Sequence, residues 1–142
     1  MGSILDNIKF INLPTIKVEG GNVMKIMKMS DYKEFKFGEA YFSSIDFNYI
    51  KGWKMQLKMT SNICIPIGEV KFTFVSKDFK YHKTFILGEN NYGIISIPPN
   101  IWYSFKGLSE KTSLILNISN SEHNEKDIKK INLEEFPIKL KL

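Results

Sequence analysis

The sequence is poor in the residues from which disulfides and metal sites are built. It has one cysteine and two histidines among 142 residues, so a disulfide framework within the chain is excluded. A first-row metal usually needs several imidazole and carboxylate ligands close together, whereas His82 and His123 are far apart in the sequence. We therefore expect no metal and no cofactor. Cys64 stands in an apolar run, which is typical of a small core residue.

Long apolar runs and blocks of positive charge are also missing. Without an apolar run of membrane-spanning length or a signal peptide, we expect a cytoplasmic protein with no membrane partner. The 20 cationic residues exceed the 15 acidic residues, for a net charge of +5, but they are lysines scattered along the chain. Nucleic-acid binders more often concentrate their cations, preferably arginines, on one stripe. We therefore expect no nucleic-acid partner and a mild preference for anionic ligands such as diphosphates.

Helical periodicity is nearly absent, and short stretches of β-branched and aromatic residues separated by Gly, Asn and Ser turns take its place. In Val70–Ser76 the apolar residues Val70, Phe72 and Phe74 alternate and should share one face of a sheet. One short helix is predicted over Asn124–Ile131, near the C-terminus. The other predicted strands cover residues 40–47, 54–67, 83–87, 92–97, 101–106 and 112–119, the last two as a hairpin, and segment 8–29 is also strand-prone.

These segments amount to about nine or ten short strands, the number that a jelly roll needs. No repeat or flexible linker divides the chain, and its length suits one core. The sequence therefore predicts an all-β protein with one jelly-roll domain over residues 1–142.

An ordered set of short motifs carries a family resemblance. The central motif is Lys51-Gly52-Trp53-Lys54-Met55-Gln56, and further matches follow in collinear order from about residue 21 to residue 137. They include Phe37–Ser43, Asn90–Gly93, Ile97–Trp102, Phe105–Leu108 and Glu122–Asn124. In these motifs the chain resembles the proteins related to dTDP-4-keto-sugar 3,5-epimerases and the sugar ketoisomerases.

The resemblance implies a double-stranded β-helix of the RmlC-like cupin type, the jelly roll already indicated by the strands. It further implies a metal-free homodimer that binds a nucleotide sugar inside the barrel and serves surface-polysaccharide biosynthesis. In that family a histidine removes a proton from the carbon beside a keto group, and a second polar residue, often tyrosine, returns a proton on the other face. A carbonyl acidifies the neighbouring carbon, and nearby cations stabilise the enolate.

The chain departs from the family pattern at the catalytic positions. Lys54 stands where the family has its proton-abstracting histidine, and Gln56 stands where many relatives have a second histidine. Tyr103 replaces a residue that is histidine in some members, and Asn117 falls where a tyrosine is expected near the last strand. From the resemblance we expect Lys54 to be the base, Tyr103 the proton donor and Lys51 a phosphate contact.

Strand geometry allows two interpretations of this segment. On one strand from Gly52 to Thr60, Lys54, Gln56 and Lys58 would share one face and Trp53, Met55 and Leu57 the other. If the lysine face lines the barrel, two lysines whose backbone positions are about 7 Å apart disfavour each other's charge, and an uncharged lysine can act as a base. Alternatively, the lysine face is simply the solvated side of the strand.

We expect the substrate to be bound by Lys51, Gln56, Lys58, Trp102 and Asn117, with Trp102 available for stacking on a ring of the ligand. Three functional hypotheses remain open. The chain is an active epimerase or isomerase, a catalytically inactive barrel that binds a sugar nucleotide or acts as a partner subunit, or a purely structural dimer.

Overall fold

The computed structural model describes residues 2–142 as a barrel of antiparallel strands. The N-terminal part contains η1 (Ile4–Asn7), β1 (Lys9–Asn12), β2 (Thr15–Ile16), β3 (Val23–Met24) and η2 (Met29–Asp31). The barrel strands that follow are β4 (Glu39–Ile45), β5 (Ile50–Gln56), β6 (Ser61–Ile67), β7 (Glu69–Ser76), β8 (His82–Gly88), β9 (Gly93–Ile97), β10 (Ile101–Gly107) and β11 (Ser113–Ser119). The chain ends with η3 (Glu125–Asp127), β12 (Ile128–Lys130) and η4 (Leu133–Glu135).

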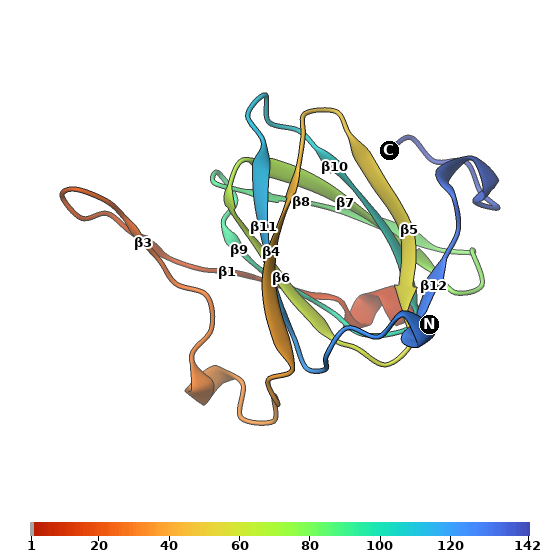
Figure 1. Cartoon of the computed structure of the whole chain (residues 1–142), viewed down its shortest axis with the longest axis horizontal. Coiled ribbons are helices and arrows are strands. Elements are labelled where there is room, and N and C mark those ends of the chain that lie inside the picture. The colour runs from red at the N-terminus through yellow and green to blue at the C-terminus, as the bar shows by residue number, and fades with distance from the viewer. Residues whose placement is uncertain (1) are drawn as a thin grey trace.

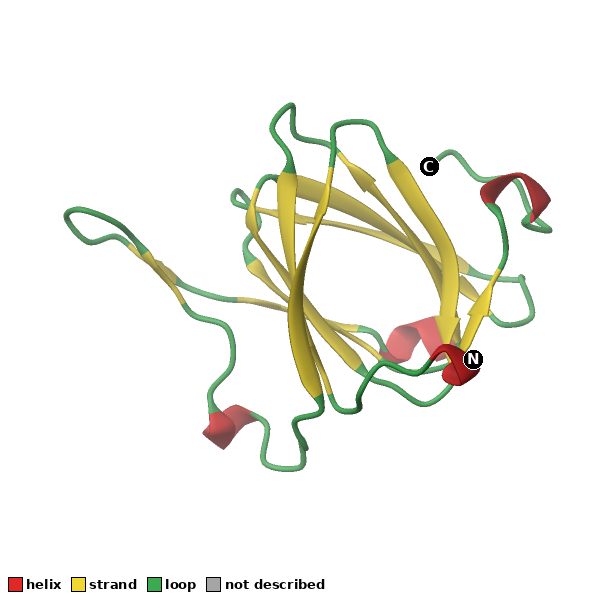
Figure 2. Cartoon of the chain, viewed as in Figure 1, coloured by secondary structure: helices red, strands yellow, loops and turns green. Residues whose placement is uncertain are grey.

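Two five-stranded sheets face each other across the barrel (Figures 1 and 2). The first sheet has the order β1-β9-β6-β11-β4, and the second has the order β12-β5-β10-β7-β8. From β4 onward the chain changes sheet at almost every connection, and only β7 and β8 are sequence neighbours within one sheet. This two-sheet arrangement confirms the predicted all-β jelly roll.

The barrel interior is filled mainly by alternating apolar residues of both sheets. Phe72 and Phe74 of β7 pack there with Phe105 and Tyr103 of β10, their register partners. Val70 belongs to the same buried cluster, so the predicted common face of Val70, Phe72 and Phe74 is confirmed.

A second apolar cluster covers the outer face of the β5–β10 part of the second sheet. Trp53 stacks on Phe136 with ring centroids 3.9 Å apart, and Met55, Val75 and Trp102 belong to the same cluster. Phe136 follows η4, so the C-terminal segment acts as the cover of this sheet. The second sheet is therefore covered by apolar side chains on both sides, with this cluster outside and the Phe72 cluster inside.

Three predicted elements differ in the structure. The predicted strand over residues 54–67 is two strands in different sheets, β5 and β6, with a turn at residues 57–60. The predicted hairpin is also wrong, because β10 pairs with β5 and β7 whereas β11 pairs with β4 and β6.

The predicted helix over Asn124–Ile131 is reduced to the single turn η3, which is followed by β12. The edge of β5 explains this outcome. Trp53 and Ile131 exchange two backbone hydrogen bonds of 2.9 and 3.1 Å, and Leu57 N–H donates to Asp127 O. Pairing with an open strand edge satisfies backbone groups that a short isolated helix would leave exposed.

A two-stranded arm formed by β2 and β3 projects from the barrel (Figure 1). Its apolar residues Ile16, Val18 and Val23 are 43%, 52% and 46% exposed. An isolated two-stranded hairpin is marginal in water, so the arm has apolar surface that the barrel does not cover.

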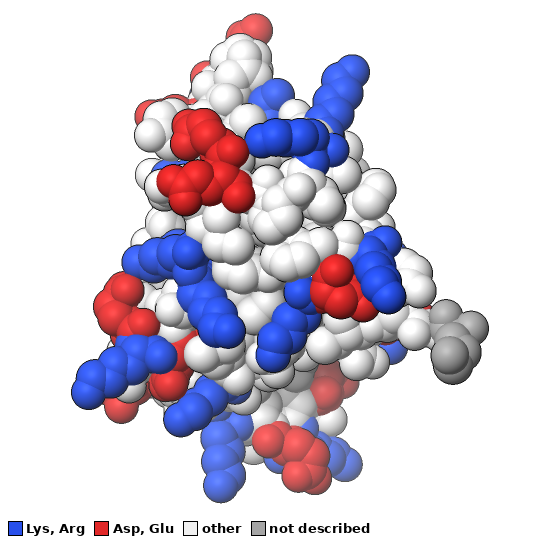
Figure 3. Space-filling model, turned by 90° about the vertical axis from the view of Figure 1, so that its right-hand side faces the viewer, with Lys and Arg blue, Asp and Glu red and all other residues white. Residues whose placement is uncertain are grey.

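No helix within residues 2–142 is long and apolar enough to cross a membrane. On the face seen in Figure 3, lysines are spread among acidic groups.

Candidate active site

The barrel interior contains a polar cavity of about 150 Å³ between the two sheets. Strand β4 contributes Tyr41 and Ser43, strand β5 contributes Lys51 and Lys54, and the facing strands add Tyr103 and Asn117. An adjoining pocket of about 320 Å³ shares both lysines and extends along β5. Cationic, phenolic and amide groups therefore converge on one site at the otherwise apolar interior.

A β-bulge in β5 brings the two lysines to the same side of the sheet. Lys54 pairs with Tyr103 and Gly52 pairs with Ser104, which leaves Trp53 as the extra residue; Lys51 then pairs with Phe105. Residues three apart would point to opposite faces of a regular strand. With the bulge, both amines share the pocket, and Lys51 Nζ donates to Ser44 O of β4 at 2.9 Å.

Lys54 lies at the opening of the cavity and keeps contact with solvent. Its pKa is lowered, first by desolvation against the barrel walls and then by the charges of Lys130 and Lys51, while Glu125 acts in the opposite direction. A lysine whose charged form is disfavoured can accept a proton. Lys54 is therefore chemically suited to the role of a general base.

Tyr103 stands beside Lys54 on β10 and is buried. Desolvation raises its pKa to about 12, with a further contribution from Tyr41 and an opposing hydrogen bond from Gln56. The Tyr103 hydroxyl is therefore protonated near neutral pH, as a proton donor must be, and burial makes it a weaker acid than an exposed tyrosine. Gln56 is buried and holds this hydroxyl.

Asn117 and Tyr41 form the opposite wall of the cavity, on β11 and β4. The Asn117 amide donates to the Tyr41 hydroxyl at 3.0 Å. Asn117 Oδ1 is buried and has no hydrogen-bond partner within residues 2–142. Because an unpaired buried acceptor is unfavourable, this oxygen is available to a donor group of a ligand.

Tyr41 and Ser43 were not among the predicted site residues. The sequence feature that could have indicated them is the alternation of Tyr41, Ser43 and Ile45 in one predicted strand, which places all three side chains on a common face.

The structure does not bring Lys58 and Trp102 to the cavity. Strand β5 ends at Gln56, so Lys58 lies in the following turn, where its side chain is 76% exposed and its amine is 3.6 Å from Asp127. Trp102 is adjacent to the inward-facing Tyr103 and therefore points to the outer face, where its ring centroid is 5.9 Å from that of Phe136. Both predicted substrate-binding residues therefore lie outside the cavity lining.

Comparison with known proteins places the chain in a family. The family model described as "FdtA: WxcM-like, C-terminal" matches residues 6–139. The chain belongs to this FdtA family.

Proteins similar to this FdtA-family chain include ones named as a sugar epimerase and sugar isomerases. A probable low-salt glycan biosynthesis epimerase, Agl13 of Haloferax volcanii, is 22% identical over 134 residues, covering 87% of this chain and 85% of the relative. The dTDP sugar isomerase of Desulfovibrio desulfuricans G20 matches in structure with a TM-score of 0.88 at 23% identity, covering 98% of this chain and 94% of that one.

The sugar 3,4-ketoisomerase QdtA of Thermoanaerobacterium thermosaccharolyticum, solved with TDP, matches in structure with a TM-score of 0.75 at 20% identity. The match covers 92% of this chain and 91% of the QdtA chain. These matches confirm the predicted resemblance and the RmlC-like cupin fold.

The two histidines of this FdtA-family chain lie outside the cavity lining. His82 begins β8 and is exposed. His123 Nε2 lies 2.8 Å from Glu125 Oε1, before η3. Among residues 2–142 no three His, Cys, Asp or Glu side chains gather as a metal site would require.

Proposed function

We propose that the chain is an epimerase or isomerase of nucleoside-diphosphate 4-keto sugars in surface-glycan biosynthesis, with Lys54 as the general base. The observation that carries this proposal is the Lys54 amine, whose pKa is lowered at the opening of a cavity that also contains two phenols and a buried amide. The FdtA family, and a relative named as a glycan biosynthesis epimerase, support the substrate class.

The proposed reaction begins with the uncharged Lys54 amine, which takes the proton from the carbon beside the keto group. The electron pair of the C–H bond moves toward the carbonyl oxygen and forms an enolate, and Lys54 becomes an ammonium ion. A phenol then returns a proton to carbon. General acid–base catalysis of this kind contributes about 10²- to 10⁴-fold to the rate.

The position of the donor decides the product in this scheme. Tyr103 is the register partner of Lys54 on the same sheet, which suits delivery of a proton to the former keto carbon once the proton of the neighbouring hydroxyl has passed to the enolate oxygen, and hence isomerisation. Tyr41 lies on the opposite sheet, which suits delivery to the other face of the carbon that lost its proton, and hence epimerisation. We propose Tyr103 as the donor for isomerisation and Tyr41 as the donor for epimerisation.

Lys51, Gln56 and Asn117 complete the proposed substrate site. Lys51 would exchange its contact with Ser44 O for a phosphate oxygen. Asn117 Oδ1 would accept a hydrogen bond from a sugar hydroxyl. Gln56 acts through Tyr103, whose hydroxyl it holds.

Solvent deuterium exchange into a 4-keto sugar nucleotide tests the base. We expect Lys54→Gln to abolish exchange beside the keto group, while Lys58→Gln, a lysine outside the cavity, exchanges at the wild-type rate. Tyr103→Phe and Tyr41→Phe should retain exchange, and the variant that loses product identifies the donor. Exchange by Lys54→Gln at the wild-type rate would exclude this base.

A second candidate function is binding without catalysis. The solvent contact of Lys54 favours it, because an ammonium at this opening could hold a diphosphate instead of abstracting a proton. A thermal shift with dTDP and no deuterium exchange in any sugar nucleotide supports this alternative, and no shift at all supports a purely structural protein.

We also propose a homodimer in which the β2–β3 arm lies against a second copy of the chain. The exposed Ile16, Val18 and Val23 support it, because apolar arm residues without a cover on the barrel are suited to an isologous interface.

A further inference from the structure

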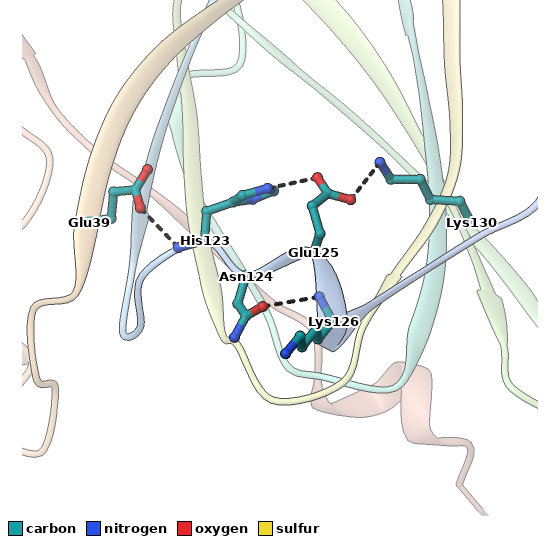
Figure 4. Close-up of polar contacts among 6 residues, drawn as sticks. All are labelled: Glu39, His123, Asn124, Glu125, Lys126 and Lys130. Carbon is teal, nitrogen blue, oxygen red and sulfur yellow. Dashed lines mark hydrogen bonds and ion pairs between the residues drawn. The ribbon is translucent and has the colours of Figure 1, made fainter.

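A row of charged side chains lies beside the candidate active site. Lys130 Nζ donates to Glu125 Oε2 at 3.0 Å, and Glu125 Oε1 is 2.8 Å from His123 Nε2. The His123 backbone N–H donates to Glu39 Oε1 at 2.9 Å. Figure 4 shows these residues in line, from Glu39 on β4 toward Lys130 on β12. The row therefore connects the edges of the two sheets.

Strand β12 places Lys130 directly opposite Lys54 in the register. Directly opposed residues of antiparallel strands project to the same face with Cβ atoms about 4.5–5.5 Å apart, and like charges in such a pair repel. The next residue, Lys129, is opposite Met55 and projects to the other face. Only one of these two neighbouring lysines therefore stands beside the Lys54 amine.

Glu125 moderates the repulsion between the two lysines. Hydrogen bonds from Lys130 and then from His123 lower the pKa of Glu125, so it is a carboxylate near neutral pH. Its charge favours the ammonium form of Lys54, whereas Lys130 and Lys51 disfavour it. The phenols Tyr103 and Tyr41 are the remaining titratable groups of the cavity wall around Lys54.

We propose that Lys130 is a positioning residue for the Lys54 base, which increases the uncharged fraction of the Lys54 amine, and that Glu125, held by His123, limits this effect. The role in catalysis rests on the proposed function, but the link between the amines is a property of the protein alone. A lysine placed next to a second cation is a recognised way to obtain an uncharged amine for chemistry.

Trace labelling of the amines with acetic anhydride over a pH series, followed by peptide mass spectrometry, measures the uncharged fraction of Lys54 without any substrate. We expect Lys130→Met to reduce labelling of Lys54 about two- to fivefold at a fixed mildly alkaline pH. Glu125→Gln should increase it. Lys129→Met is the matched control, because it removes the same charge from the same strand on the other face.

Equal effects of Lys130→Met and Lys129→Met on Lys54 labelling would overturn the proposal, because net charge would then account for both. In the deuterium-exchange assay, Lys130→Met should move the rise of the pH–rate profile to higher pH while the plateau rate stays unchanged. Suppose that Lys130→Met changes the labelling of Lys54, but the wild type catalyses no deuterium exchange. The link between the two amines would then stand, and the proposed function would be refuted.

Discussion

Tyr103 is the residue whose burial has the clearest consequence for the pH dependence of stability. Its pKa is raised to about 12, mainly by desolvation, from an ordinary value of 10.0. The folded state therefore holds this proton more tightly than the unfolded state does. The resulting contribution to the free energy of unfolding is fully present below about pH 10 and is lost as the pH rises through about 12.

We predict that Tyr103→Phe flattens the alkaline decrease in stability. The wild type should lose up to about 2–3 kcal/mol between pH 10 and 12 from this group, and the variant should lack this loss. Urea unfolding at pH 9, 10, 11 and 12 measures the difference, with Tyr49→Phe, an exposed phenol, as the control. Parallel curves for the wild type and Tyr103→Phe would contradict the prediction.

Single residues of the site were predictable from the sequence where strand alternation holds. Lys54, Gln56 and Asn117 face the interior as the period of two and the family motif indicated. Lys58 was misplaced because nothing in its own residue type marks the end of β5 at Gln56. Trp102 was misplaced because an aromatic residue suits a ligand pocket and an apolar cover equally, and the C-terminal Phe136 that packs on it is distant in sequence.

At the level of elements, Gly68 controls the crossing from β6 to β7. Its φ is +88°, and a Cβ there would overlap the Ser113 side chain of β11. Glycine is therefore required both by the backbone conformation and by the close approach.

We predict that Gly68→Ala destabilises the fold by about 2–4 kcal/mol, since strain and overlap act together. Gly20→Ala is the matched control, because Gly20 has a φ of +86° but nothing near its added Cβ; it should cost only about 1 kcal/mol. Denaturant unfolding of both variants measures the two contributions. Equal losses would show that the contact with Ser113 is unimportant.

The elements that the sequence analysis missed are those decided by partners distant in the chain. The acids Glu125 and Asp127 precede Lys129 and Lys130, as in a short helix, but the open edge of β5 makes residues 128–130 a strand. Likewise, a turn between two strands looks the same in sequence whether the second strand pairs with the first or crosses to the other sheet. The strands themselves, being local and strongly patterned, were mostly predicted correctly.

On the scale of the whole molecule, the projecting arm determines the expected assembly. We predict that Ile16→Lys combined with Val23→Lys converts a dimer into a folded monomer, because charges on these exposed apolar positions oppose their burial in an interface. Light scattering coupled to size-exclusion chromatography measures the mass, and circular dichroism checks the fold. As a control, the exposed lysines Lys77 and Lys80 lie in the turn after β7, and Lys77→Glu combined with Lys80→Glu should leave the mass unchanged. A dimeric double variant would exclude the arm as the interface.

The bulge at Trp53 divides β5 into two halves whose inward positions are out of phase. Deletion of Trp53 would remove the bulge and leave Lys51 and Lys54 two positions apart, so ordinary alternation would keep both amines on the chamber side while the outer cluster loses the indole that stacks on Phe136. The face of every β5 position before Trp53 therefore depends on this one extra residue, and a sequence alignment that assumes strict alternation through β5 would place those side chains on the wrong side of the sheet.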